Sequence, residues 1–73
     1  MESTDLKYAI IIYWSDEDEA FIAEMPELAG CAADGRSPQD ALHALHSVAR
    51  EWIVTAREMG RNIPEPKGRP PFV

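Results

Sequence analysis

The sequence has little cysteine and little positive charge. Its 73 residues include a single cysteine, Cys31, and seven Lys and Arg against thirteen Asp and Glu, which gives a formal charge of −6. One cysteine cannot form an internal disulfide, and it cannot hold a zinc ion without several other ligands. A surface short of Lys and Arg is also poorly suited to the phosphates of nucleic acid. These absences exclude a disulfide scaffold and argue against nucleic acid as the main ligand, but they are compatible with a basic protein partner.

Long apolar runs are absent too. The longest extends from Tyr8 to Trp14, seven residues, whereas a membrane-spanning helix needs about 20. The first residues carry acids before any apolar run, unlike a secretory signal. We therefore expect a soluble, cytoplasmic protein that does not bind membranes. A chain of this length buries only about 60% of its unfolded surface, so we also expect a homo-oligomer, most simply a dimer.

The pattern of apolar residues predicts three short strands. Residues 6–14 are rich in β-branched and aromatic side chains, and residues 20–25 alternate apolar and polar positions. An acidic turn separates these two strands, and Pro26 and Gly30 mark a second turn before a third strand at residues 30–34. Successive strands joined by short turns predict an antiparallel meander.

One long helix is predicted at residues 38–59. Ser37 is suited to the N-cap, Pro38 to the first helical position, and Gly60 to the position after the helix end. Residues 61–73 hold four of the six prolines, which predicts an irregular tail with room for a short fourth strand near Phe72. The predicted fold class is α+β, a single β-β-β-α domain over residues 1–73, with the helix packed on a three-stranded antiparallel sheet.

Two apolar surfaces of this predicted fold are candidates for a partner or for self-association. A helix of this length measures about 33 Å and extends past the sheet, and the outer face of the sheet has no cover of its own. The candidate residues on these two surfaces are Trp52, Ile53 and Met59 on the helix and Ile11, Tyr13 and Ile22 on the sheet. Residues 1–49 hold ten acids and two bases, so we expect the acidic turn, Asp16, Glu17, Asp18 and Glu19, to steer a basic partner electrostatically.

No pattern of catalytic or metal-binding residues is found. The acidic turn lacks the spacing and the glycine of a calcium loop. His43 and His46 have no further ligand at a matching spacing, and Cys31 has no identifiable base. Ile12 and Trp14 share one face of the first predicted strand. The pattern assigns this face, and the helix face that carries Trp52, to the core. We predict no catalytic residue, no metal and no cofactor, and therefore a protein that is not an enzyme.

Several segments resemble the HicB antitoxins. The apolar run from Tyr8 to Trp14 is followed by an F-x-A-x-x-P-x-L-x-G-C stretch that begins at Phe21, and by a G-x-S-x-x-x-A helix entry that begins at Gly35. The similarity covers residues 6–66. One departure is Glu19, since the first turn of this family usually has a glycine.

The resemblance implies a partial ribonuclease-H-like fold without the catalytic carboxylates of that enzyme. It also implies a protein that binds a small, basic, mRNA-cleaving toxin of the HicA type and covers its active site. Many relatives of this kind have an additional DNA-binding domain, but 73 residues leave no room for one, so direct DNA binding is not expected here. Two alternatives are a solitary, self-associating regulatory or structural domain without a toxin and, least favoured, a residual nuclease.

Overall fold

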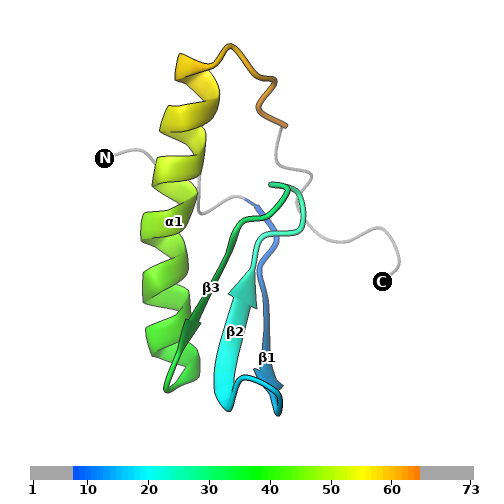
Figure 1. Ribbon diagram of the computed structural model, residues 1–73, viewed down its shortest axis with the longest axis vertical. Helices are drawn as coiled ribbons and strands as arrows, with labels where there is room; N and C mark the ends of the chain where they lie inside the picture. The colour runs from blue at the N-terminus through cyan, green and yellow to red at the C-terminus, as the bar shows by residue number, and fades with distance from the viewer. Residues whose placement is uncertain (1–7, 65–73) are drawn as a thin grey trace.

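A three-stranded antiparallel sheet and one long helix make up the fold. The structure is a computed structural model that describes residues 8–64. Strands β1 (Ile11–Ser15), β2 (Ala20–Glu24) and β3 (Ala32–Gly35) are followed by helix α1 (Pro38–Glu58). The strands lie in the order β1-β2-β3, and α1 packs along the sheet (Figure 1). The predicted α+β class with its β-β-β-α order is confirmed, whereas the fourth strand suggested near Phe72 falls outside the described residues.

Hydrogen bonds of the turn between β2 and β3 set the strand ends. The last pair of β1 and β2 joins Ile11 to Glu24. On the β3 side of β2, the N–H of Met25 donates to the carbonyl of Cys31 at 3.0 Å. The N–H of Cys31 in turn donates to the carbonyl of Leu28 at 2.9 Å. These bonds hold residues 25–31 in a closed loop. β3 therefore begins at residue 32, after this loop, and β1 begins at residue 11; both strands start later than the sequence predicted.

Both ends of α1 form as the sequence predicts. The Ser37 hydroxyl accepts a hydrogen bond from the N–H of Asp40 at 3.0 Å, and Pro38 occupies the first helical position. At the other end Gly60 has a φ of +72°. The N–H of Gly60 donates to the carbonyl of Arg57 at 3.2 Å, and the N–H of Arg61 donates to the carbonyl of Ala56 at 2.8 Å. This pair of bonds is a Schellman motif, which requires the left-handed backbone that glycine adopts readily.

Gly35 lets the start of the helix approach the sheet. A Cβ atom at this position would lie 2.4 Å from the backbone N of Ala41 and 2.7 Å from the carbonyl carbon of Asp40. Both neighbours are backbone atoms, so neither can rotate away. The end of β3 therefore touches the first turn of α1 in a way that only glycine allows.

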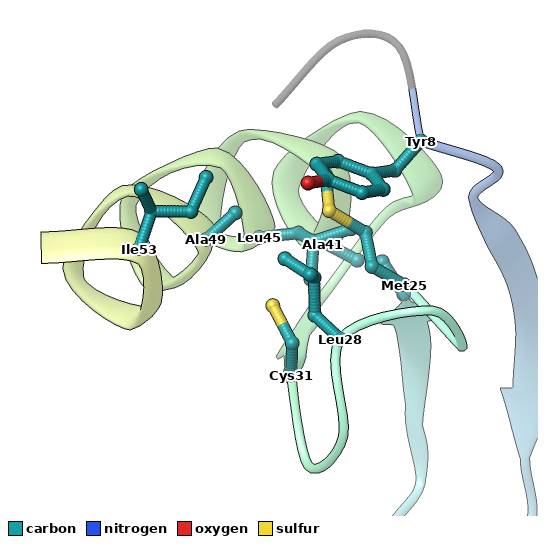
Figure 2. Close-up of a cluster of buried hydrophobic side chains, with 9 residues drawn as sticks. Tyr8, Met25, Leu28, Cys31, Ala41, Leu45, Ala49 and Ile53 are labelled. Carbon is teal, nitrogen blue, oxygen red and sulfur yellow. The ribbon is translucent and has the colours of Figure 1, made fainter. Parts of the chain in front are cut away.

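The core lies between α1 and the 25–31 loop, as well as between α1 and the sheet. Met25, Leu28 and Leu45 are the largest side chains with almost no exposed surface. Figure 2 shows Leu28, Cys31 and Met25 beside the helix residues and beneath the ring of Tyr8. The complete cluster is Tyr8, Ala23, Met25, Leu28, Cys31, Ala41, Leu45, Ala49 and Ile53.

The helix extends past the strands, as predicted (Figure 1), and the side chains on its inward face there, Ile53 and Ala56, are buried. Ile53 is only 8% exposed and belongs to the core cluster, and Ile63 packs against the same cluster from beyond the helix end. The indole N–H of Trp52 donates to the carbonyl of Ala29 at 2.9 Å, which ties the helix to the 25–31 loop. The prediction of an open apolar overhang is therefore wrong for Ile53.

Candidate functional site

Four consecutive large apolar side chains are exposed on β1. Ile11, Ile12, Tyr13 and Trp14 keep between 37% and 50% of their surface open to solvent. Single exposed apolar residues are ordinary on a protein surface, but a contiguous group indicates an interaction site. We name this group the β1 patch.

The β1 patch is open because α1 lies to one side of the sheet. The helix packs mainly against β3, less against β2 and least against β1. Small residues beneath the helix, Ala23, Ala33 and Gly35, allow this close approach to β2 and β3. β1 is the strand farthest from the helix and is therefore left largely uncovered by it (Figure 1).

The register divides the patch between the two faces of the sheet. Ile12 pairs with the buried Ala23, and Trp14 pairs with Phe21, so Ile12 and Trp14 share the face on which the helix packs. Tyr13 pairs with Ile22 on the opposite, outer face. The sequence assigned Ile12 and Trp14 to the core face correctly, but their expected burial is wrong because the helix packs least against β1.

Trp14 is held in place although half of its surface is exposed. Its ring meets the ring of Phe21 edge to face, with 5.1 Å between ring centroids and 70° between ring planes. Its indole N–H donates to a carboxylate oxygen of Asp16 at 2.7 Å. A side chain with both contacts presents a fixed surface to a partner, because less conformational entropy is lost on binding.

Tyr13 gives the outer face a polar contact. Its hydroxyl donates to a carboxylate oxygen of Glu24 at 2.8 Å. This hydrogen bond, and to a smaller extent burial and the charges of Glu24 and Asp18, raises the pKa of Tyr13 above its ordinary 10.0. The phenol therefore stays neutral near pH 7, and the outer face combines apolar groups with a negative charge at its edge.

The acidic turn follows β1 directly. Its four residues, Asp16, Glu17, Asp18 and Glu19, are all exposed. The hydroxyl of Ser15 accepts from the N–H of Asp18 at 3.2 Å and donates to the Asp18 carboxylate at 3.1 Å, which fixes the first half of the turn. Glu19 has a φ of +52°, the backbone conformation that glycine adopts most easily. Four carboxylates therefore lie at the end of the β1 patch.

The six predicted interface residues do not form one surface. Ile11 and Tyr13 are exposed and Ile22 is half-buried, all on the outer face of the sheet. Trp52 is half-buried against the 25–31 loop, Ile53 is in the core, and Met59 is exposed at the helix end. Ile53 is thus too buried to form part of a surface, and the interface role of the other five residues stays a prediction.

Sequence reasoning missed Ile12 and Trp14 as exposed residues. A signal was present in the small residues Ala23, Ala33 and Gly35, which indicate where a helix can come closest to a sheet. The large residues of β1 face the same side but cannot allow such an approach. This contrast in side-chain size predicts which strand the helix leaves open.

The residues considered for chemistry lie apart from the patch. Cys31 is buried in the core, and burial raises the pKa of its thiol. His43 is exposed and His46 is half-buried on α1. Across residues 8–64, no three His, Cys, Asp or Glu side chains come together in a way that could hold a metal ion. Nor does this part of the chain contain a helix long and apolar enough to cross a bilayer.

Comparison with known proteins places the chain in a family. A model of the family described as UPF0150-like matches residues 6–64. This match includes the whole meander and the whole helix. The chain belongs to the UPF0150-like family.

Two relatives of this UPF0150-like protein are similar to it over most of their length. It is 36% identical over 59 residues to UPF0150 protein ssl0259 of Synechocystis sp., covering 81% of this chain and 80% of that relative. It is 30% identical over 59 residues to UPF0150 protein Ta0767 of Thermoplasma acidophilum, covering 81% of this chain and 84% of that relative. No solved structure gives a significant match.

Proposed function

We propose that this UPF0150-like protein is a non-enzymatic antitoxin of the HicB type. In this proposal it binds a small, basic, mRNA-cleaving toxin of the HicA type and blocks the active site of the toxin. Two lines of support are the resemblance of the meander and helix entry to HicB antitoxins and the membership of the UPF0150-like family. The observation that supports it best is the position of the acidic turn at the end of the exposed β1 patch.

The outer face of the sheet is the surface we assign to the toxin. Ile11, Tyr13 and Ile22 supply neighbouring apolar side chains on this face, and Glu24 and Asp34 lie on it as well. Apolar contacts of this kind lower the dissociation rate, whereas charges at the rim mainly raise the association rate. A basic partner would thus be attracted by the acidic turn and held by the apolar residues.

The alternative function is a solitary self-associating domain with a regulatory or structural role and no toxin. The observation in its favour is that the β1 patch has apolar residues on both faces of the strand, and one partner bound on the outer face would leave Ile12 and Trp14 exposed. The two functions differ in a direct assay. Only the antitoxin stops mRNA cleavage by a purified basic toxin of the HicA type encoded beside it.

The electrostatic part of the proposal is tested by removing two negative charges either from the acidic turn or from the helix and comparing the association rates. We expect the double variant Glu17→Gln/Glu19→Gln to slow association with the toxin by about tenfold at low salt, because charge complementarity accounts for rate changes of this size. Stopped-flow or surface-binding kinetics at several salt concentrations would measure the effect, which should shrink as salt rises.

The matched control is Glu51→Gln/Glu58→Gln, which removes the same charge from exposed positions on α1. It should leave the association rate within about twofold of the unmodified protein, since the charges lost are not on the acidic turn. Equal slowing by both double variants would show that only net charge matters. Undiminished mRNA cleavage in the presence of saturating protein would disprove the antitoxin function itself.

A further inference from the structure

The free edge of β1 needs a strand partner. Among the described residues β1 pairs only with β2, so its other edge has no strand beside it. Exposed edge strands are usually protected by Lys, Pro, bulges or inward-pointing charges, because an unprotected edge pairs with other chains. Residues Ile11–Trp14 contain no charged residue, no proline and no glycine. None of these protective features is therefore present within Ile11–Trp14 itself.

We propose that β1 pairs with β1 of a second copy of this chain, antiparallel and edge to edge, to form one continuous six-stranded sheet. The two copies are then related by a two-fold axis perpendicular to the sheet. Such an axis places both helices on one side of the sheet and both outer faces on the other. This inference does not depend on the existence of a toxin.

The composition of the patch favours a second copy as the occupant. Ile12 and Trp14 are exposed on the helix side, and Ile11 and Tyr13 on the outer side. A strand that covers this edge must itself be apolar on both faces, and β1 of another copy has that property. The register that pairs all five residues of β1 places Tyr13 on the two-fold axis. Each Ile12 then lies opposite Trp14 of the second copy, an aliphatic–aromatic cross-strand pair.

Charge selects the antiparallel arrangement. The acidic turn follows Ser15 at one end of β1, so parallel pairing would place eight carboxylates side by side. Antiparallel pairing separates the two acidic turns. It also places each turn at the same end of the sheet as the other copy's helix end, since the hairpin turn and the end of α1 lie at opposite ends of one copy (Figure 1).

The tail of the same chain is a poor alternative occupant. Residues 65–73 include three prolines, Pro66, Pro70 and Pro71. Proline has no N–H to donate to a strand ladder and is confined to edges and strand ends. Between Pro66 and Pro70 stand only three residues, 67–69, which are too few to pair with five residues of β1.

Solution mass measured across a wide concentration series tests the proposal. The unmodified full chain should change from a species of 8.2 kDa to one of twice that mass as concentration rises, because five paired residues make a short interface. Ile12→Lys should raise the dissociation constant at least tenfold, since it places a charge at the apolar edge. Val54→Lys is the matched control, because Val54 is 52% exposed on α1, and it should dimerise like the unmodified chain.

A second measurement does not depend on the folding of the Ile12→Lys variant. In the Trp52→Phe variant the remaining Trp14 should show a fluorescence blue shift as concentration rises, because its exposed half becomes buried. In a Cys31→Ala background, Tyr13→Cys should form a disulfide between two chains, and Val54→Cys should do so much more slowly.

A monomer at every concentration, or equal weakening by Ile12→Lys and Val54→Lys, would overturn the proposal. A constant Trp14 spectrum together with a dimer would overturn it as well, since the copies would then meet elsewhere. All these measurements use the purified chain alone, so their failure leaves toxin binding untouched. A protein that inhibits the toxin but never dimerises would separate the two proposals.

Discussion

Gly35 is the residue whose replacement should disturb the fold most directly. An added Cβ would overlap backbone atoms of Asp40 and Ala41, and relief requires moving β3 away from α1. We expect Gly35→Ala to lower the free energy of unfolding by about 2 kcal/mol, a typical cost of overpacking. Urea denaturation followed by circular dichroism would measure it. Asp34→Ala, at the exposed neighbouring position of β3, should change stability by less than about 0.5 kcal/mol, and an equal loss in both variants would refute the role of close approach.

Cys31 makes stability depend on alkaline pH. Burial raises the pKa of the folded thiol above its ordinary 9.0, so the unfolded chain loses this proton at a lower pH than the folded chain does. The contribution of the neutral thiol to the free energy of unfolding is fully present below about pH 9 and is lost as pH rises further. The urea midpoint should therefore fall between pH 8 and pH 10. Tyr13 acts in the same direction, so Cys31→Ala should reduce the fall without abolishing it, and an unchanged fall would show that the thiol has no part in it.

The hairpin of β1 and β2 is strained at one position, which gives a prediction at the scale of the element. Glu19 adopts a φ of +52°, and this conformation costs a residue with a side chain about 1 kcal/mol or more. Glu19→Gly should raise the free energy of unfolding by roughly 0.5–1 kcal/mol. The control Glu17→Gly should lower it, because Glu17 has no positive φ and glycine there only adds flexibility to the unfolded chain. Thermal denaturation would detect both changes, and a loss in both variants would contradict the strain.

The helix was predictable from sequence because its signals are local. Ser37, Pro38 and Gly60 mark its ends through bonds to residues only a few positions away. The strand ends were less predictable. The first strand looked longer because residues 8–10 have the composition of a strand, but the pairing of β1 with β2 ends at Ile11 and Glu24, where β2 gives way to the 25–31 loop. Alternation along the chain does not show where that loop begins.

At the scale of the whole molecule, the sequence predicted which side chains of the sheet face the helix but not which of them the helix buries. Alternation placed Ile12 and Trp14 on the helix side, as the register shows. Whether they are buried depends on the lateral position of α1, which is set by the small residues of β2 and β3. The same limit applies to Ile53, which was expected to be open but is covered by residues far away in sequence. Contacts between distant segments are thus what the pattern could not supply.

Charge is distributed unevenly along the long axis of the molecule. The four carboxylates of the acidic turn are at one end, and α1 finishes at the other, where Arg57 and Arg61 outnumber Glu58. A single copy therefore has an electric dipole moment roughly parallel to its strands. In the field of a cationic partner this dipole experiences a torque that turns the hairpin forward before contact. The molecule is thus oriented as well as attracted, and fewer encounters end with the wrong face presented.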